Sequence, residues 1–123
     1  MKIERFEDIE GWKIGRKLAN LVCDFTAQKL FSMDFGLRDQ IQRAAGSVMH
    51  NIAEGFDFGT NPEFARFLGY SKRSCTEVQS ELYLALDRGY ISEKQFDEAM
   101  KLAEEAKSAT GGFIRYLQNN PKP

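Results

Sequence analysis

The sequence predicts an all-α fold, an antiparallel up-down-up-down four-helix bundle formed by a single domain over residues 1–123. Three observations predict it. Apolar residues recur at three- and four-residue steps through four long stretches, which is the spacing of one helix face. Short turn-rich segments separate the stretches, and short connections favour antiparallel neighbours. No stretch of useful length alternates polar and apolar residues, so no strand is expected.

The first predicted helix spans residues 9–31 and is apolar over an unusually wide arc. Its apolar residues form two stripes, Ile14, Leu18, Leu21, Val22 and Phe25 in one and Trp12, Ala19, Cys23, Thr26 and Leu30 in the other. A helix with so wide an arc is either central in its own domain or buried between subunits.

The second predicted helix, residues 37–55, carries an apolar stripe and a separate polar stripe. The apolar stripe consists of Leu37, Ile41, Ala44, Ala45, Val48 and Ile52. About a quarter-turn away, the polar stripe consists of Gln40, Arg43, Ser47, Asn51 and Glu54. These short polar groups suit packing against another polar surface, although a solvated flank of an ordinary amphipathic helix is an equal alternative. Gly55 is expected to end the helix.

The third and fourth predicted helices span residues 61–88 and 92–118. Asn61 is the expected N-cap of the third helix, with Pro62 at the first helical position and Gly89 as the stop. Ser92 and Gln95 have the spacing of a capping box at the start of the fourth. The Gly pair at 111–112 predicts either a kink or a close approach by another helix.

The charge balance argues against strong non-specific binding to nucleic acid. The chain has 17 Lys and Arg against 18 Asp and Glu, a formal net charge of −1, and the signs are mixed along its length. A local patch stays open, because Arg66, Tyr70 and Arg73 share one outer face of the third helix with Lys72 beside them. A solvated face or a subunit contact is the favoured interpretation of this patch.

No set of residues in the sequence predicts catalysis. The single histidine, His50, lies away from both stripes of its helix, and no metal-ligand spacing is present. Glu77 and Glu81 are four residues apart and could form a paired-carboxylate site, but a solvated face or an ion pair with another helix is favoured. We therefore expect no enzyme activity, no cofactor, no metal and no small-molecule substrate.

The remaining sequence features indicate a soluble, cytoplasmic protein. Cys23 and Cys75 lie far apart in helical patterns and are expected to be reduced thiols. The first residues are rich in acids and do not form a signal peptide. No apolar run approaches the roughly 20 residues of a membrane helix, so no membrane partner is expected.

The second helix resembles the core motif of the small bacterial proteins called 23S rRNA intervening-sequence proteins, the S23 family. The motif reads Gln40-x-x-Arg43-Ala44-Ala45-x-Ser47-Val48-x-x-Asn51-Ile52-Ala53-Glu54-Gly55. Similar residues surround it in the same order: Phe6, Asp8, Trp12, Phe35-Gly36-Leu37, Phe64, Phe67-Leu68 and Gly89-Tyr90. One departure is visible, because Arg73 stands where the family usually has a small residue, while Ser74 and Glu77 are kept.

The resemblance implies an antiparallel four-helix bundle that assembles into a homopentameric ring without enzyme activity. The primary expectation is a ring-forming interaction or scaffold protein, in which the polar stripe fixes the register between helices or subunits and Arg43 pairs with Glu77. The alternative is a nucleic-acid-binding accessory protein acting with RNA or a reverse-transcriptase-like partner. This alternative is suggested by the accessory variability determinant of diversity-generating retroelements, a related bundle. That relative is strongly basic, unlike this chain.

Overall fold

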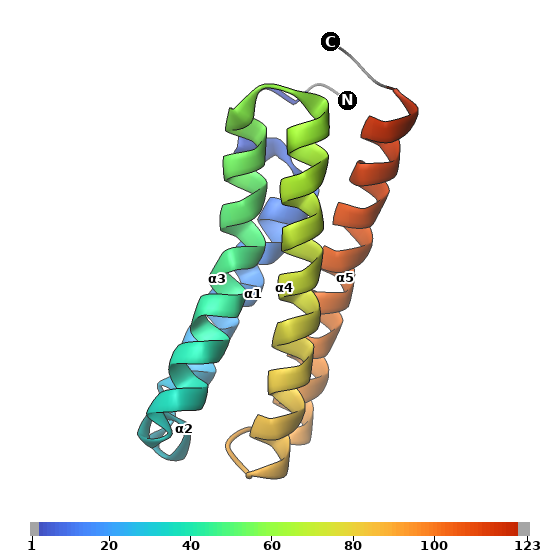
Figure 1. The fold of residues 1–123 in the computed structure, drawn as a ribbon. Helices are drawn as coiled ribbons and strands as arrows, with labels where there is room; N and C mark the ends of the chain where they lie inside the picture. The colour runs from blue at the N-terminus through green and yellow to red at the C-terminus, as the bar shows by residue number, and fades with distance from the viewer. Residues whose placement is uncertain (1–2, 121–123) are drawn as a thin grey trace.

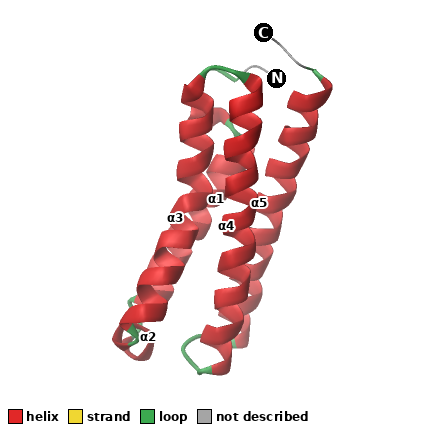
Figure 2. Cartoon of the chain, viewed as in Figure 1, coloured by secondary structure: helices red, strands yellow, loops and turns green. Residues whose placement is uncertain are grey.

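A computed structural model describes residues 3–120, and every described element is helical. The elements in chain order are a short 3-10 helix and five α-helices: η1 (Phe6–Asp8), α1 (Glu10–Thr26), α2 (Lys29–Met33), α3 (Phe35–Phe58), α4 (Asn61–Asp87) and α5 (Glu93–Asn119). The four long helices lie side by side, with short connections at both ends (Figures 1 and 2). The described residues contain no strand, as the sequence predicts.

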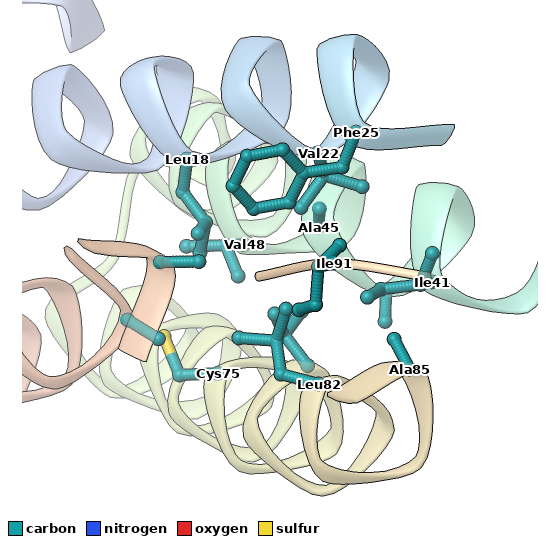
Figure 3. Packing of buried hydrophobic residues seen from close by; sticks show 14 of the residues in the cluster. Leu18, Val22, Phe25, Ile41, Ala45, Val48, Cys75, Leu82, Ala85 and Ile91 are labelled. Atoms are coloured by element: carbon teal, nitrogen blue, oxygen red, sulfur yellow. The ribbon is translucent and has the colours of Figure 1, made fainter. Parts of the chain in front are cut away.

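The long helices pack in a closed cycle of neighbours. α3 packs on α4, α4 on α5, and α1 on both α3 and α5. The main core lies between them, where Leu18, Val22 and Phe25 of α1 meet Ala45 and Val48 of α3 (Figure 3). α4 and α5 complete this core with Cys75, Val78, Leu82, Ala85, Ala99, Ala103 and Ala106.

The predicted first helix is two helices, because the chain breaks after Thr26. The Thr26 hydroxyl is 2.9 Å from the Val22 carbonyl oxygen, to which it donates, and it accepts from the Gln42 amide at 2.8 Å. Gln28 then adopts an extended conformation, and α2 starts at the next residue. A hydroxyl that bonds the preceding turn and a neighbouring helix competes with continuation of the helix.

The wide apolar arc of α1 is buried mostly against other helices of the same chain. Trp12, Leu18, Val22, Phe25 and Thr26 are buried, since α1 packs on two neighbouring helices. Of the two predicted explanations for the wide apolar arc, a central position in its own domain therefore applies to most of α1. Ile14, Ala19 and Leu21 are half-buried, Cys23 is exposed, and Leu30 is 61% exposed.

Gly55 does not end α3, contrary to the sequence prediction. The helix continues to Phe58, and Gly59 ends it with a φ of 93°. Gly55 is required for a different reason: a Cβ there would lie 2.6 Å from the Cβ of Phe67 and 3.0 Å from Cδ1 of Phe64. The glycine therefore allows α4 to approach α3 closely.

The ends of α4 and α5 agree largely with the sequence. The N-cap of α4 is Thr60 instead of Asn61, and its hydroxyl accepts from the Glu63 N–H at 3.4 Å. Ser92 and Gln95 form the predicted capping box of α5, with bonds of 3.1 and 2.9 Å. α5 runs unbroken from Glu93 through the glycine pair to Asn119.

Candidate interaction surface on α3 and α4

The polar stripe of α3 makes few contacts within the chain. Gln40, Arg43 and Glu54 are exposed, and Ser47 and Asn51 are half-buried. Asn51 donates to the Ser47 carbonyl of its own helix at 2.8 Å. Five polar residues on one helix face thus remain available to a partner outside the chain.

The predicted ion pair between Arg43 and Glu77 is not formed within the chain. Residues 3–120 contain four ion pairs, and neither residue takes part in any of them. Arg43 is exposed, so its own charge is solvated without an ion-pair partner. Its positive charge acts instead on Glu81, one turn further along α4.

Glu81 is the residue that the sequence interpretation placed wrongly. It is only 7% exposed, and neither of its carboxyl oxygens has a hydrogen-bond partner among the described residues. Burial and the adjacent Glu77 carboxyl raise the pKa of Glu81 to about 7, while Arg43 acts in the opposite direction. The helix period offered a signal, because Glu81 lies three residues from Val78 and four from Ala85, both in the buried stripe.

Glu77 and Glu81 together form what we call the acidic pair. Two ionised carboxylates can only accept hydrogen bonds, whereas a proton on Glu81 turns it into a donor toward Glu77. Such perturbed carboxyls occur at catalytic sites and also at structural contacts. The grooves at the α1–α5 seam and at the end of α1, α4 and α5 are lined by neither carboxyl. The acidic pair thus stands beside the polar stripe without a described substrate cavity.

Three of the four residues predicted as a nucleic-acid patch form a stack on the outer face of α4. The guanidinium groups of Arg66 and Arg73 lie 5.8 and 5.4 Å from the centre of the Tyr70 ring. Lys72 does not join them, because its Nζ lies 3.5 Å from the position a Cβ would take at Gly111 of α5. Arg73 is exposed and does not intrude between α3 and α4.

The contact between α3 and α4 holds these groups in register. Ser71 is fully buried and its hydroxyl donates to the Val48 carbonyl at 2.7 Å. Gly55 and Phe67 provide the close approach at the other end. The polar stripe, the acidic pair and the arginine–tyrosine stack are therefore built on two helices with fixed relative positions.

The described residues contain no group of three or more His, Cys, Asp or Glu side chains that could hold a metal ion. His50 is exposed, as is Cys23, while Cys75 is buried and its burial raises the pKa of the thiol to about 11. None of the described helices is long and apolar enough to cross a membrane.

The sequence profile of the family described as 23S rRNA-intervening sequence protein matches residues 7–112. The chain belongs to this family. The match includes α1, α3, α4 and most of α5, and so contains the polar stripe and the acidic pair. The resemblance inferred from the second helix is thereby confirmed at the level of the family.

One solved structure shows the same fold. It is the crystal structure of a protein of unknown function from the S23 ribosomal protein family of Bacteroides thetaiotaomicron, determined at 1.70 Å resolution. The two chains are 19% identical, the match covers 85% of this chain and 95% of that chain, and the TM-score is 0.78. No curated protein matches the chain significantly.

Proposed function

We propose that this protein is a non-catalytic interaction or scaffold protein. In this proposal its four long helices form an antiparallel up-down-up-down bundle that assembles with further copies into a ring, with five subunits as the expected number. The observation that carries the proposal is the unsatisfied polar surface on α3 and α4. Arg43 has no ion pair, and the buried carboxyl of Glu81 has no hydrogen-bond partner among the described residues.

Assembly would supply partners for the polar groups on α3 and α4 that have none in the isolated chain. A buried carboxylate without a partner costs free energy, so a surface that supplies a partner gains it back on association. The polar stripe adds directional hydrogen-bond groups that would fix the register between subunits.

A substitution of Arg43 tests the proposed role of the stripe. Because Arg43 is exposed, Arg43→Ala should change the stability of the isolated chain by less than about 0.5 kcal/mol. The same variant should lower the assembled fraction, measured by light scattering on a sizing column. Lys29→Ala, an exposed change outside this surface, is the control. Equal assembly of Arg43→Ala and the control would remove Arg43 from the proposed interface.

Nucleic-acid binding is the second candidate function, and the stack of Arg66, Tyr70 and Arg73 favours it. Arg73 and the Tyr70 ring can hold a phosphate and stack on a base, while Arg66 beside them is also paired with Glu63 at 2.7 Å. A ring would repeat the patch in every subunit. RNA, or a protein such as a reverse transcriptase that handles RNA, would then be the partner.

An RNA titration tests this second function. Single-stranded and structured RNA should bind more weakly to Arg66→Ala and Arg73→Ala, and binding should weaken as salt rises. Lys72→Ala is the matched control, because Lys72 lies toward α5 and outside the stack. Absence of binding at low salt would exclude the nucleic-acid role.

A further inference from the structure

We propose that the acidic pair, Glu77 and Glu81, receives a basic side chain from the outer face of α1 of a second copy of this chain. This contact depends on the self-assembly proposed above, and it specifies which two surfaces of neighbouring subunits meet.

The receiving surface has a negative charge that the chain itself does not neutralise. Glu77 is exposed, and Glu81 behind it is 93% buried with both carboxyl oxygens unpartnered in the described part of the chain. The charged groups that face Glu81 are Glu77 on its own helix and Arg43 on α3. Arg43 is too far to form an ion pair with either carboxyl, so a cation from outside has a place beside Glu77.

The donating surface is a basic cluster of Lys13, Arg16 and Lys17 on α1. All three side chains are exposed, and none is in an ion pair within residues 3–120. They line a groove of about 630 Å³ between α1 and α5, together with the apolar residues Ile14, Leu21 and Leu102 and the acidic residues Glu10, Asp24 and Glu98. A neighbouring helix seated in this groove would bury apolar surface and bring its carboxylates to the lysines.

The acidic pair lies on α4 at its α3 flank, and the basic cluster lies on the outer face of α1. α1 and α4 each pack on both α3 and α5, so their outer faces point away from each other (Figure 1). Contact between two different surfaces of identical subunits is heterologous, and such contacts form rings when the rotation closes. The acidic pair meeting the α1 cluster is therefore a contact of the ring-forming kind.

The axial positions of the two surfaces require only a small offset between copies. Gly15 packs against Val48, whose carbonyl accepts from Ser71, so these residues lie at one level. Toward the α2 end, Lys17 is two residues and Glu77 six residues from that level, a difference of roughly 6 Å at the rise of an α-helix. A lysine side chain and a shift of about one helical turn cover this distance.

Docking of a cation makes the assembly sensitive to pH. A positive charge beside the acidic pair favours its ionised form and so lowers the pKa of the pair. Since burial holds the pKa of Glu81 at about 7 in the free subunit, docking releases protons near neutral pH. By linkage, association must then become tighter as pH rises through this range.

The first experiment measures the dissociation constant of the full-length chain by sedimentation at about pH 6 and about pH 8. We expect up to about tenfold tighter association at the higher pH, which corresponds to one unit of change in pKa per contact. Glu81→Gln keeps the shape and removes the titration, so its association should be weaker at the higher pH and independent of pH. Its melting temperature, measured in parallel, shows that the subunit is folded.

The second experiment exchanges the charges of the two surfaces. Lys13→Glu combined with Lys17→Glu should weaken association, and adding Glu77→Lys to the same chain should restore it. Lys29→Glu, an exposed lysine outside both surfaces, should leave association unchanged.

The outcomes separate this inference from the proposed function. Tighter association at high pH that is lost in Glu81→Gln, with rescue by charge exchange, supports the contact. Association that is unchanged by pH, by Glu81→Gln and by the charge exchange overturns the proposed contact. It leaves the proposal of a ring standing. A chain that is monomeric under all conditions overturns both.

Discussion

The surroundings of Glu81 disfavour the ionised form of its side chain. Its carboxyl is buried beside another carboxyl, and Arg43, the cation that opposes it within residues 3–120, forms no ion pair with it. Because its pKa in the folded chain, about 7, is above the ordinary 4.5, the native state binds more protons than the unfolded state between these values. The stability of the subunit should therefore fall as pH rises from 4.5 through 7, by up to about 3 kcal/mol.

Glu81→Gln should remove this pH dependence. At about pH 8 the variant should be more stable than the parent chain by a large part of that amount, and at about pH 5 the two should be equal. Urea unfolding at a protein concentration where the chain is monomeric measures the difference. Glu105→Gln, at an exposed position on α5, is the control and should change neither value. Identical pH profiles for Glu81→Gln and the parent would show that Glu81 is not protonated in the native subunit.

Gly55 is the second residue at which the surroundings matter, because they leave no room for a side chain. A methyl group there would lie 2.6 Å from the Cβ of Phe67, so Gly55→Ala must push α4 away from α3. We expect a loss of about 1–3 kcal/mol in the free energy of unfolding, measured by denaturant titration.

Gly69→Ala provides the matched control for this glycine. Gly69 is also inside a helix, but a Cβ there would meet nothing within 4 Å. This variant should be more stable by roughly 0.5–1 kcal/mol, because alanine loses less backbone entropy in a helix. Equal stabilisation by both variants would mean that helix propensity, not close packing, governs Gly55.

At the scale of elements, Asp34 joins the start of α3 to the segment between α4 and α5. Its carboxylate accepts from the Leu37 N–H at 3.2 Å and from the Tyr90 hydroxyl at 2.9 Å, and the Tyr90 ring stacks on Phe31. These hydrogen bonds lower the pKa of Asp34, so the stability they give is present at neutral pH and is lost as pH falls through the folded-state value.

Asp34→Ala should lower the melting temperature at neutral pH, since it removes both an N-cap and the link to Tyr90. Tyr90→Phe should lower it less, because the cap remains. Asp39→Ala, an exposed acid on the same helix, is the control and should have little effect. The effect of Asp34→Ala should shrink at low pH, and a melting temperature that stays unchanged at neutral pH would contradict the capping role.

The sequence predicts helices well but not the way in which they meet. Apolar spacing located the four long helices to within a few residues, because burial of one face is a local, periodic property. The break after Thr26 does not follow from apolar spacing, and the Gln42 amide that bonds the Thr26 hydroxyl lies sixteen residues away. The role of Gly55 is not visible in the sequence of one helix, because the close approach of Phe67 is a tertiary contact.

The candidate surface was predicted in part for the same reason. The polar stripe of α3 and the arginine–tyrosine stack of α4 follow from helix periodicity alone. The burial of Glu81 depends on how closely α3 flanks α4, and the position of Lys72 depends on Gly111 of α5. Neither the burial of Glu81 nor the position of Lys72 can be predicted from the sequence of one helix alone.

At the scale of the whole molecule, the proposed property is association with further copies of the chain. The chain belongs to the 23S rRNA-intervening sequence protein family and shares the fold of an S23-family protein. The ring itself is proposed from the unsatisfied surface on α3 and α4 and from the basic cluster on α1. In that proposal, assembly supplies the partner that the buried carboxyl of Glu81 lacks among the described residues.

The most direct test is the native mass of the chain at about pH 8, measured by light scattering on a sizing column with and without RNA. One chain has a mass of 14.0 kDa, and the proposed ring predicts a single species near five chains that does not require RNA. A mass equal to one chain at every concentration would contradict the proposed assembly.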